Sequence, residues 1–183
     1  MRVIAGEARS IPLIAPKGQK TRPTSDRIKE TLFNLISDKV YNCVFLDLFS
    51  GSGQIGIEAL SRGAREAIFI EYDKEAFSCI KKNVLKTKFS DKSKLYNTTV
   101  LNALKNFDRK EKKFDIIYID PPFLENQENE VLNFIAKSKI VTNKTIIILE
   151  ISLETNVDFL NELFNVLKEK KYKNSKHIFM EIK

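Results

Sequence analysis

Short apolar runs alternate with amphipathic segments along most of this 183-residue sequence, and no other feature restricts its fold as strongly. Strands are expected at residues 44–48, 67–70, near 95–101, 114–119, 145–149 and, last in the chain, 175–182. Helices are expected from a Thr24 or Ser25 cap to about Ser37, at residues 54–62, 74–88 and 128–139, and, as a weak helix, after residue 101. Residues 155–183 are expected to hold a helix and then strands. This alternation predicts an α/β fold with a mostly parallel, doubly wound sheet covered by helices on both faces.

Composition narrows the class of protein. The two cysteines, Cys43 and Cys79, are too few for a disulfide framework, so we expect them to pack as small apolar groups in a reducing compartment. No apolar stretch approaches the roughly 20 residues that span a bilayer, and the first residues resemble no signal peptide. We therefore expect a cytoplasmic protein without membrane contact. His177 is the sole histidine, so neither a metal site nor a histidine-based triad is expected.

The net charge of +7 is concentrated at the two ends of the chain. Residues 1–30 hold seven basic and three acidic side chains, and residues 168–183 hold six lysines and two glutamates. Basic ends favour a polyanionic partner such as nucleic acid. Lysines that only keep the surface soluble would give the same pattern, so charge alone leaves both interpretations open.

A glycine-rich turn follows the first predicted strand. Gly51, Gly53 and Gly56 form a GxGxxG pattern between that strand and a helix, where glycine lets the backbone turn sharply and approach a ligand. Glu71 follows the second strand, twenty residues beyond Gly51, and can accept hydrogen bonds from both ribose hydroxyls of a nucleoside cofactor. A tight turn without a ligand is the alternative. Asp73 better fits the start of the next helix.

The most specific motif, Asp120-Pro121-Pro122-Phe123, follows the fourth predicted strand. The prolines fix the backbone and remove two N–H donors, so the Pro121 carbonyl and the Asp120 carboxylate offer two acceptors at one place. Such a pair suits a planar NH2 group, and Phe123 can stack on a flat base. A proline turn that merely leaves a strand is the alternative.

Four carboxylates gather at the carboxyl edge of the strands, where ligands bind: Asp47, Glu71, Asp73 and Asp120. An acidic edge repels the pyrophosphate of a dinucleotide but suits a cofactor with hydroxyl, ammonium and sulfonium groups. S-adenosyl-L-methionine carries all three, so the sequence favours methyl transfer over hydride transfer.

Five segments carry a family resemblance: residues 2–6, 21–27, 30–34, 46–64 and 120–123. On these segments the chain resembles the RsmD-like family of 16S rRNA guanine-N2 methyltransferases. The loop and the DPPF motif are shared by many amino-methyltransferases, and residues 22–34 are the narrower signature. The chain departs from the family at Ala5, where glycine is usual, and at Ser50, where alanine is common. Asn102 stands where the wider superfamily is often acidic, and residues 172–175 lack an expected glycine.

The resemblance implies a Rossmann-like class I methyltransferase fold with an antiparallel C-terminal strand and a short N-terminal arm. It implies one domain over residues 1–183, with the arm and first helix in 1–38 and the cofactor-binding, catalytic core in 39–183. The implied reaction is N2-methylation of a guanine in 16S rRNA with S-adenosyl-L-methionine. The implied partner is 16S rRNA or an assembling small ribosomal subunit, and the implied enzyme is a monomer without metal.

The residues assigned through this resemblance fall into three groups. The catalytic group contains Asp120, Pro121 and Phe123. The cofactor-binding group contains Asp47, Phe49, Ser50, Gly51, Gly53, Gly56, Glu71, Asn102 and Ala103. The RNA-binding group contains Arg2, Arg9, Arg22, Thr24 and Arg27, although Arg22 could equally help to close the pocket.

Three rival functions remain open at the level of sequence. The same chemistry could act on adenine N6 in DNA or on a glutamine amide, because DPPF excludes neither. A nicotinamide-dependent oxidoreductase can use the same fold, but it needs a proton-transfer group for which the sequence offers no clear candidate. A non-enzymatic RNA-binding protein that keeps a vestigial pocket is the third.

Overall fold

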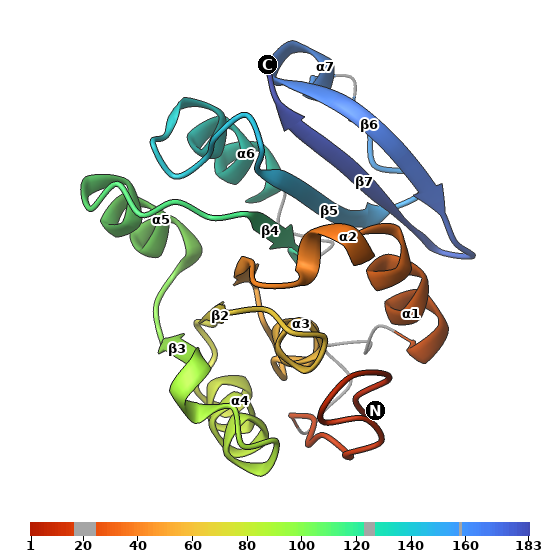
Figure 1. Cartoon of the computed structure of the whole chain (residues 1–183). Coiled ribbons are helices and arrows are strands. Elements are labelled where there is room, and N and C mark those ends of the chain that lie inside the picture. Colours follow the sequence, from red (N-terminus) through yellow and green to blue (C-terminus); the bar gives the residue numbers. More distant parts are fainter. Residues whose placement is uncertain (17–24, 123–126, 158) are drawn as a thin grey trace.

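A seven-stranded sheet forms the centre of the molecule (Figure 1). The computed structural model describes residues 1–16, 25–122, 127–157 and 159–183. The strands lie in the order β3-β2-β1-β4-β5-β7-β6. Their bounds are β1 Val44–Leu48, β2 Glu66–Ile70, β3 Ser93–Tyr96, β4 Ile116–Ile119, β5 Ile146–Ser152, β6 Phe164–Lys171 and β7 Ser175–Ile182. Strands β1 to β5 pair in parallel, whereas β7 runs antiparallel to both β5 and β6. The predicted fold class, including the antiparallel C-terminal strand, is confirmed.

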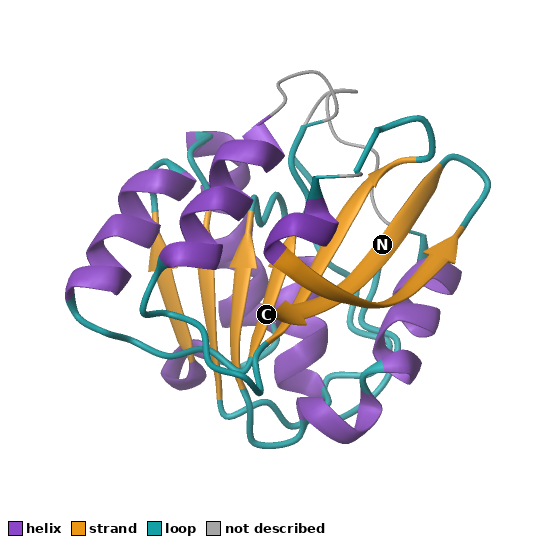
Figure 2. Ribbon diagram, turned by 90° about the horizontal axis from the view of Figure 1, so that it is seen from above, coloured by secondary structure: helices purple, strands orange, loops and turns teal. Residues whose placement is uncertain are grey.

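Helices cover both faces of the sheet (Figures 1 and 2). One hydrophobic cluster joins a sheet face to α1 Asp26–Leu35, α2 Ser37–Val40, α3 Gln54–Ser61 and α4 Lys74–Lys86. A second cluster joins the other face to α5 Val100–Arg109, α6 Gln127–Lys137 and α7 Leu160–Leu163. A short 3-10 turn, η1, spans Ser90–Lys92. The two cores explain why apolar side chains fill the central strands on both sides.

The predicted element boundaries hold well, with one clear exception. Strands β1 and β7 have the predicted bounds, and the Ser25 hydroxyl caps α1 by accepting a hydrogen bond from the Ile28 N–H at 3.3 Å. The strand expected near residues 95–101 is present, but its bounds are wrong, because β3 spans Ser93–Tyr96 and α5 begins at Val100. Thr99 caps that helix by accepting the Asn102 N–H at 3.4 Å. A β-branched run that resembles a strand is therefore partly a helix cap and a first turn.

The N-terminal arm packs against α3 and α4 instead of adding a strand. The β-pairing described within the arm is limited to an isolated antiparallel bridge between Arg2 and Pro12. A Cβ on Gly6, whose φ is +82°, would lie 1.7 Å from the Ser61 carbonyl oxygen, so only glycine fits this contact. The Asn83 side chain accepts the Ile14 N–H at 2.7 Å and donates to the Ile14 carbonyl at 2.8 Å. These contacts fix the arm on the helical layer beside the glycine-rich turn.

Cys43 and Cys79 are both buried free thiols, which confirms their predicted role as packing groups. Among the described residues, no helix is both long and apolar enough to cross a membrane. Within the same ranges, no group of three or more histidine, cysteine, aspartate or glutamate side chains could hold a metal ion.

Candidate active site

The turn between β1 and α3 has a conformation that requires glycine at two positions. Gly51 and Gly53 have φ values of +56° and +78°, and Phe49 also has a positive φ of +60°. The turn is closed by the Gly53 N–H, which donates to the Ser50 carbonyl at 2.7 Å. A Cβ on Gly51 would meet no atom within 4 Å. The backbone at Gly51 therefore faces open space in which a ligand can approach.

Three other residues of the predicted cofactor-binding group, Asp47, Ser50 and Gly56, stabilise the glycine-rich turn through hydrogen bonds and close packing. Asp47 is 1% exposed and accepts the Gly56 N–H at 3.0 Å. Burial raises the pKa of Asp47 to about 7, against the opposing hydrogen bond from Gly56. A Cβ on Gly56 would lie 2.3 Å from Phe69 Cε1, so this glycine permits α3 to pack closely on β2. The Ser50 hydroxyl donates to the Asp47 carbonyl at 2.7 Å and ties β1 to the turn.

Glu71 lies directly beside this turn, at the carboxyl end of β2. Its Oε2 accepts the Gly51 N–H at 2.7 Å, and its Oε1 accepts the Asp73 N–H at 2.8 Å. The side chain is half-buried, and burial raises its pKa despite these hydrogen bonds. Asp73 caps α4 by accepting the Ala76 N–H at 2.8 Å, as predicted. Glu71 thus occupies the predicted position next to the glycine-rich turn.

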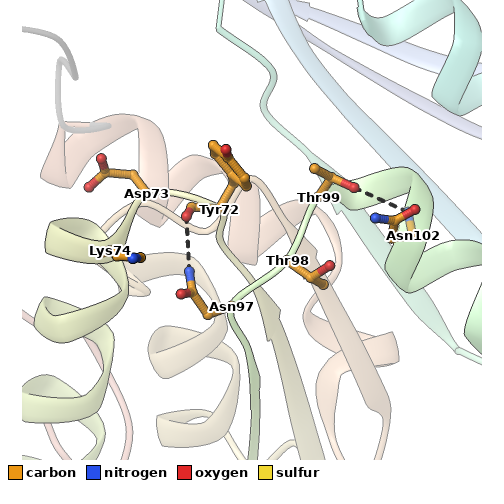
Figure 3. Close-up of a pocket in the computed structure, with 7 residues that line it drawn as sticks. All are labelled: Tyr72, Asp73, Lys74, Asn97, Thr98, Thr99 and Asn102. Atoms are coloured by element: carbon orange, nitrogen blue, oxygen red, sulfur yellow. Dashed lines mark hydrogen bonds between the residues drawn. The ribbon is translucent and has the colours of Figure 1, made fainter.

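A cavity of about 520 Å³ lies between the turns that follow β2 and β3, and its lining begins at Tyr72, the residue after Glu71 (Figure 3). It is lined by Tyr72, Asp73, Lys74, Asn97, Thr98, Thr99 and Asn102. The Asn97 amide donates to the Glu71 and Tyr72 carbonyls at 2.8 and 2.9 Å and joins the two turns. The Tyr72 side chain is 73% exposed. The sequence analysis missed this aromatic group, although its place beside Glu71 was a usable signal.

The two predicted site residues of α5 lie in different environments. Asn102, which was assigned to the cofactor-binding group, is exposed in the first turn of the helix and lines the cavity. The Ala103 methyl group packs in the core, and its N–H donates to the Thr99 carbonyl at 3.1 Å. Ala103 therefore packs the start of α5 against the sheet.

Asp120 follows β4 at the same edge of the sheet. It is half-buried, and burial raises the pKa of its carboxyl, assisted by the neighbouring carboxylates Glu150 and Asp47. Pro121 is buried and Pro122 is exposed, so the chain leaves the core between them. Phe123 lies outside the described residues. Asp120 and Glu71 thus come from different strands of one edge, as parallel strand order predicts.

The predicted RNA-binding residues lie at the surface where they are described. Arg2, Arg9 and Arg27 are exposed, and the Arg2 Nε donates to Asp26 Oδ2 at 3.1 Å. Arg22 and Thr24 lie outside the described residues. At the other end of the chain, β6 forms an edge strand with exposed lysines at 168, 170 and 171. Both basic ends therefore present cations to solvent.

Comparison with known proteins assigns the chain to a family. The family model described as Conserved hypothetical protein 95 matches residues 1–181. This chain belongs to that family. The Conserved hypothetical protein 95 assignment agrees with two curated relatives, and together they confirm the RsmD-like resemblance expected from the sequence.

The first of these relatives, "Ribosomal RNA small subunit methyltransferase D" of Haemophilus influenzae, is 34% identical over 173 residues, covering 93% of this chain and 88% of that protein. "Putative rRNA methyltransferase YlbH" of Bacillus subtilis is 35% identical over 150 residues, covering 82% of each. A solved structure, "Putative methyltransferase yhhF from Escherichia coli", superposes with a TM-score of 0.84 and 28% identity, covering 100% of this chain and 98% of that one. These proteins are similar to the present member of the Conserved hypothetical protein 95 family along nearly its whole length.

Proposed function

We propose that this protein transfers a methyl group from S-adenosyl-L-methionine to N2 of a guanine in small-subunit rRNA. The observation that carries the proposal is the position of Glu71 and Asp120 at the same edge of the sheet, after β2 and β4, with Glu71 holding the open Gly51 turn between them. Family membership and relatives named as small-subunit rRNA methyltransferases support the substrate. We treat residues 1–183 as one methyltransferase domain with residues 1–38 as its docked arm and first helix.

The residues at this edge fit the proposed cofactor. Gly51 leaves open space, Glu71 offers carboxylate oxygens to ribose hydroxyls, and Asn102 offers an amide to the adenine amine. Tyr72 presents an exposed ring on which adenine can stack. Carboxylates at Glu71 and Asp120 favour the positive charges of the ammonium and sulfonium groups. When bound, the cofactor supplies a methyl group on a positively charged sulfur.

Asp120 and Pro121 make the acceptor nitrogen reactive. The lone pair of guanine N2 is delocalised into the ring, which makes the amine a poor nucleophile. The Asp120 carboxylate and the Pro121 carbonyl accept its two hydrogens and turn the lone pair towards the methyl group. As the nitrogen–carbon bond forms and the sulfur–carbon bond breaks, the surplus proton leaves nitrogen for Asp120 or water. Phe123 holds the base flat after it has left its stack.

The basic ends hold the flanking RNA. We assign phosphate contacts to Arg2, Arg9, Arg22 and Arg27, with Thr24 as a hydrogen-bonding neighbour, so affinity falls steeply with salt. The substrate is 16S rRNA or an assembling small subunit, and a monomer in the cytoplasm carries out the reaction.

The test supplies the protein and S-adenosyl-L-methionine to small subunits from cells that lack it, to free 16S rRNA and to DNA. Mass spectrometry of the nucleosides is expected to show N2-methylguanosine in ribosomal RNA. Methylated adenine in DNA with unmodified RNA would favour the exocyclic-amine rival. Tight, salt-sensitive RNA binding without any methylation or cofactor binding would favour a non-enzymatic RNA-binding protein.

A thermal-shift comparison addresses the cofactor separately. S-adenosylhomocysteine is expected to raise the melting temperature because it binds the folded chain alone, whereas NAD leaves it unchanged. A shift with NAD and none with S-adenosylhomocysteine would favour the oxidoreductase.

A further inference from the structure

A buried network of polar side chains surrounds Glu150, in the middle of β5. Glu150 Oε2 accepts the Tyr118 hydroxyl at 2.5 Å and lies 2.8 Å from His177 Nε2. Its Oε1 accepts the Ser175 hydroxyl at 3.2 Å. On the far side of the imidazole ring, the Tyr172 hydroxyl lies 3.0 Å from His177 Nδ1. His177 is fully buried and Glu150 is 6% exposed, so the carboxylate is held in one position by three strands and a turn.

Strand pairing places this network directly behind the proposed acceptor. Strands β4 and β5 pair in parallel with Ile119 opposite Leu149, so the next residues along, Asp120 and Glu150, are neighbours. Tyr118 precedes Asp120 by two residues and therefore points to the same face of the sheet. Adjacent strands lie about 4.8 Å apart, and across this gap the charge of Glu150 raises the pKa of the Asp120 carboxyl.

The surroundings shift the pKa values of Glu150 and Asp120 in opposite directions. Burial favours the neutral form of Glu150, but the hydrogen bond and charge of His177, with the hydroxyls of Tyr118 and Ser175, outweigh it and lower the Glu150 pKa. Burial raises the pKa of Asp120, and the charges of Glu150 and Asp47 raise it further. Two carboxyl groups whose pKa values are driven apart are the usual arrangement of an acid–base site.

We propose that Glu150, anchored beside Asp120 by its contacts with His177, Tyr118 and Ser175, is a positioning residue that makes Asp120 a stronger hydrogen-bond acceptor for the substrate amine in the proposed reaction. The negative charge of Glu150 makes the Asp120 carboxylate a stronger proton acceptor, because a buried anion nearby stabilises any proton that Asp120 receives or shares. His177, Tyr118 and Ser175 supply the hydrogen bonds that keep this anion in place. The network thus couples β7, the last strand of the chain, to the edge where β4 ends.

The first test measures kcat/KM for methyl transfer as a function of pH, because this profile reports ionisations of the free enzyme. Glu150→Gln removes the charge and is expected to move the acid limb to lower pH by about one unit, as adjacent charges at an effective dielectric constant near 20 imply. Glu66→Gln is the matched control, since Glu66 starts β2 at the opposite edge and pairs with Lys112 at 2.8 Å. It is expected to leave the acid limb unchanged. An unchanged limb in Glu150→Gln would overturn the proposal.

The second test needs neither activity nor a folded variant. Carbon-13 NMR of labelled carboxyl groups in the unmodified protein follows the titration of Asp120 and Glu150 directly. Asp120 is expected to titrate above the ordinary aspartate range and Glu150 below the ordinary glutamate range. An ordinary titration of Asp120 near about 4 would overturn the proposal. Absence of methyl transfer with the expected titrations would instead count against the proposed function.

Discussion

The ammonium group of Lys29 lies 3.7 Å from the carboxylate of Glu58, and both side chains are fully enclosed. Lys29 also donates to the Arg2 carbonyl at 2.5 Å, while Glu58 accepts the Ile4 and Ala5 N–H groups at 2.8 and 3.0 Å. The pair therefore joins α1, α3 and the N-terminal arm in one buried contact. Burial lowers the pKa of Lys29, against the opposing charges of Glu58 and Asp26.

Lys29→Met is expected to reduce the free energy of unfolding by about 2 kcal/mol, because the Arg2 carbonyl loses its donor and buried Glu58 keeps Arg62, at 2.9 Å, as its remaining cation. Urea denaturation measures the loss. Lys39→Met is the matched control, since Lys39 and its partner Asp38 are mostly exposed, and a change within about 0.5 kcal/mol is expected there. A loss below about 1 kcal/mol for Lys29→Met would contradict the role given to this pair.

The raised pKa of the buried Asp47 carboxyl is expected to make the stability of the cofactor-free protein depend on pH. Its pKa is about 7 in the folded chain and near 3.8 when exposed, so the group binds more protons in the folded state. Stability from this residue is full below about pH 4 and declines as pH rises through about 7, by roughly 4 kcal/mol at most. Asp47→Asn is expected to flatten this decline between about pH 4 and pH 7 in urea denaturation. Parallel curves for the two proteins would show that Asp47 does not titrate in this way.

Gly56 and Phe69 are expected to be energetically coupled, because a Cβ on Gly56 would lie 2.3 Å from the Phe69 ring. Gly56→Ala should cost about 2 kcal/mol of stability through overpacking. Phe69→Leu makes room, so the double variant should lose clearly less than the sum of the two single losses. Strictly additive losses in urea denaturation would mean that the helix shifts to accept the methyl group.

Tyr72→Ala is expected to weaken binding of S-adenosylhomocysteine about tenfold in isothermal titration calorimetry, because it removes a stacking surface beside the cavity. Tyr41→Ala is the matched control, since Tyr41 is 81% exposed and lies outside the cavity lining. Equal affinity for the two variants would remove Tyr72 from the proposed cofactor site.

Local patterns predicted much of the fold and of the sheet edge. The apolar run Val44–Leu48 predicted β1, and the following glycines predicted a turn with positive φ values. Glu71 and Asp120 each follow a predicted parallel strand, so the sequence placed both at the carboxyl edge of the sheet. These features depend on residues that are close in the sequence, so the sequence carries them directly.

Other features depend on residues far apart in the sequence. Lys29 is a charged residue on a helix face, and its burial becomes intelligible only with Glu58 beneath it. His177 had no predicted partner, because Glu150 reaches it through the pairing of β5 with β7. Within the sequence, this network is indicated locally by a charged residue, Glu150, among the apolar residues of β5. Gly56 and Ala103 were assigned to the cofactor-binding group, and their packing against Phe69 and in the core depends on contacts that the sequence pattern does not reveal.

The central claim is that Asp120 acts mainly on the acceptor amine, so that its loss reduces methyl transfer far more than cofactor binding. Asp120→Ala is expected to bind S-adenosylhomocysteine within about threefold of the unmodified affinity while methyl transfer to small-subunit rRNA falls at least about a hundredfold. Calorimetry and mass spectrometry of N2-methylguanosine measure the two quantities on the same preparation. Full methyl transfer by Asp120→Ala would contradict the account.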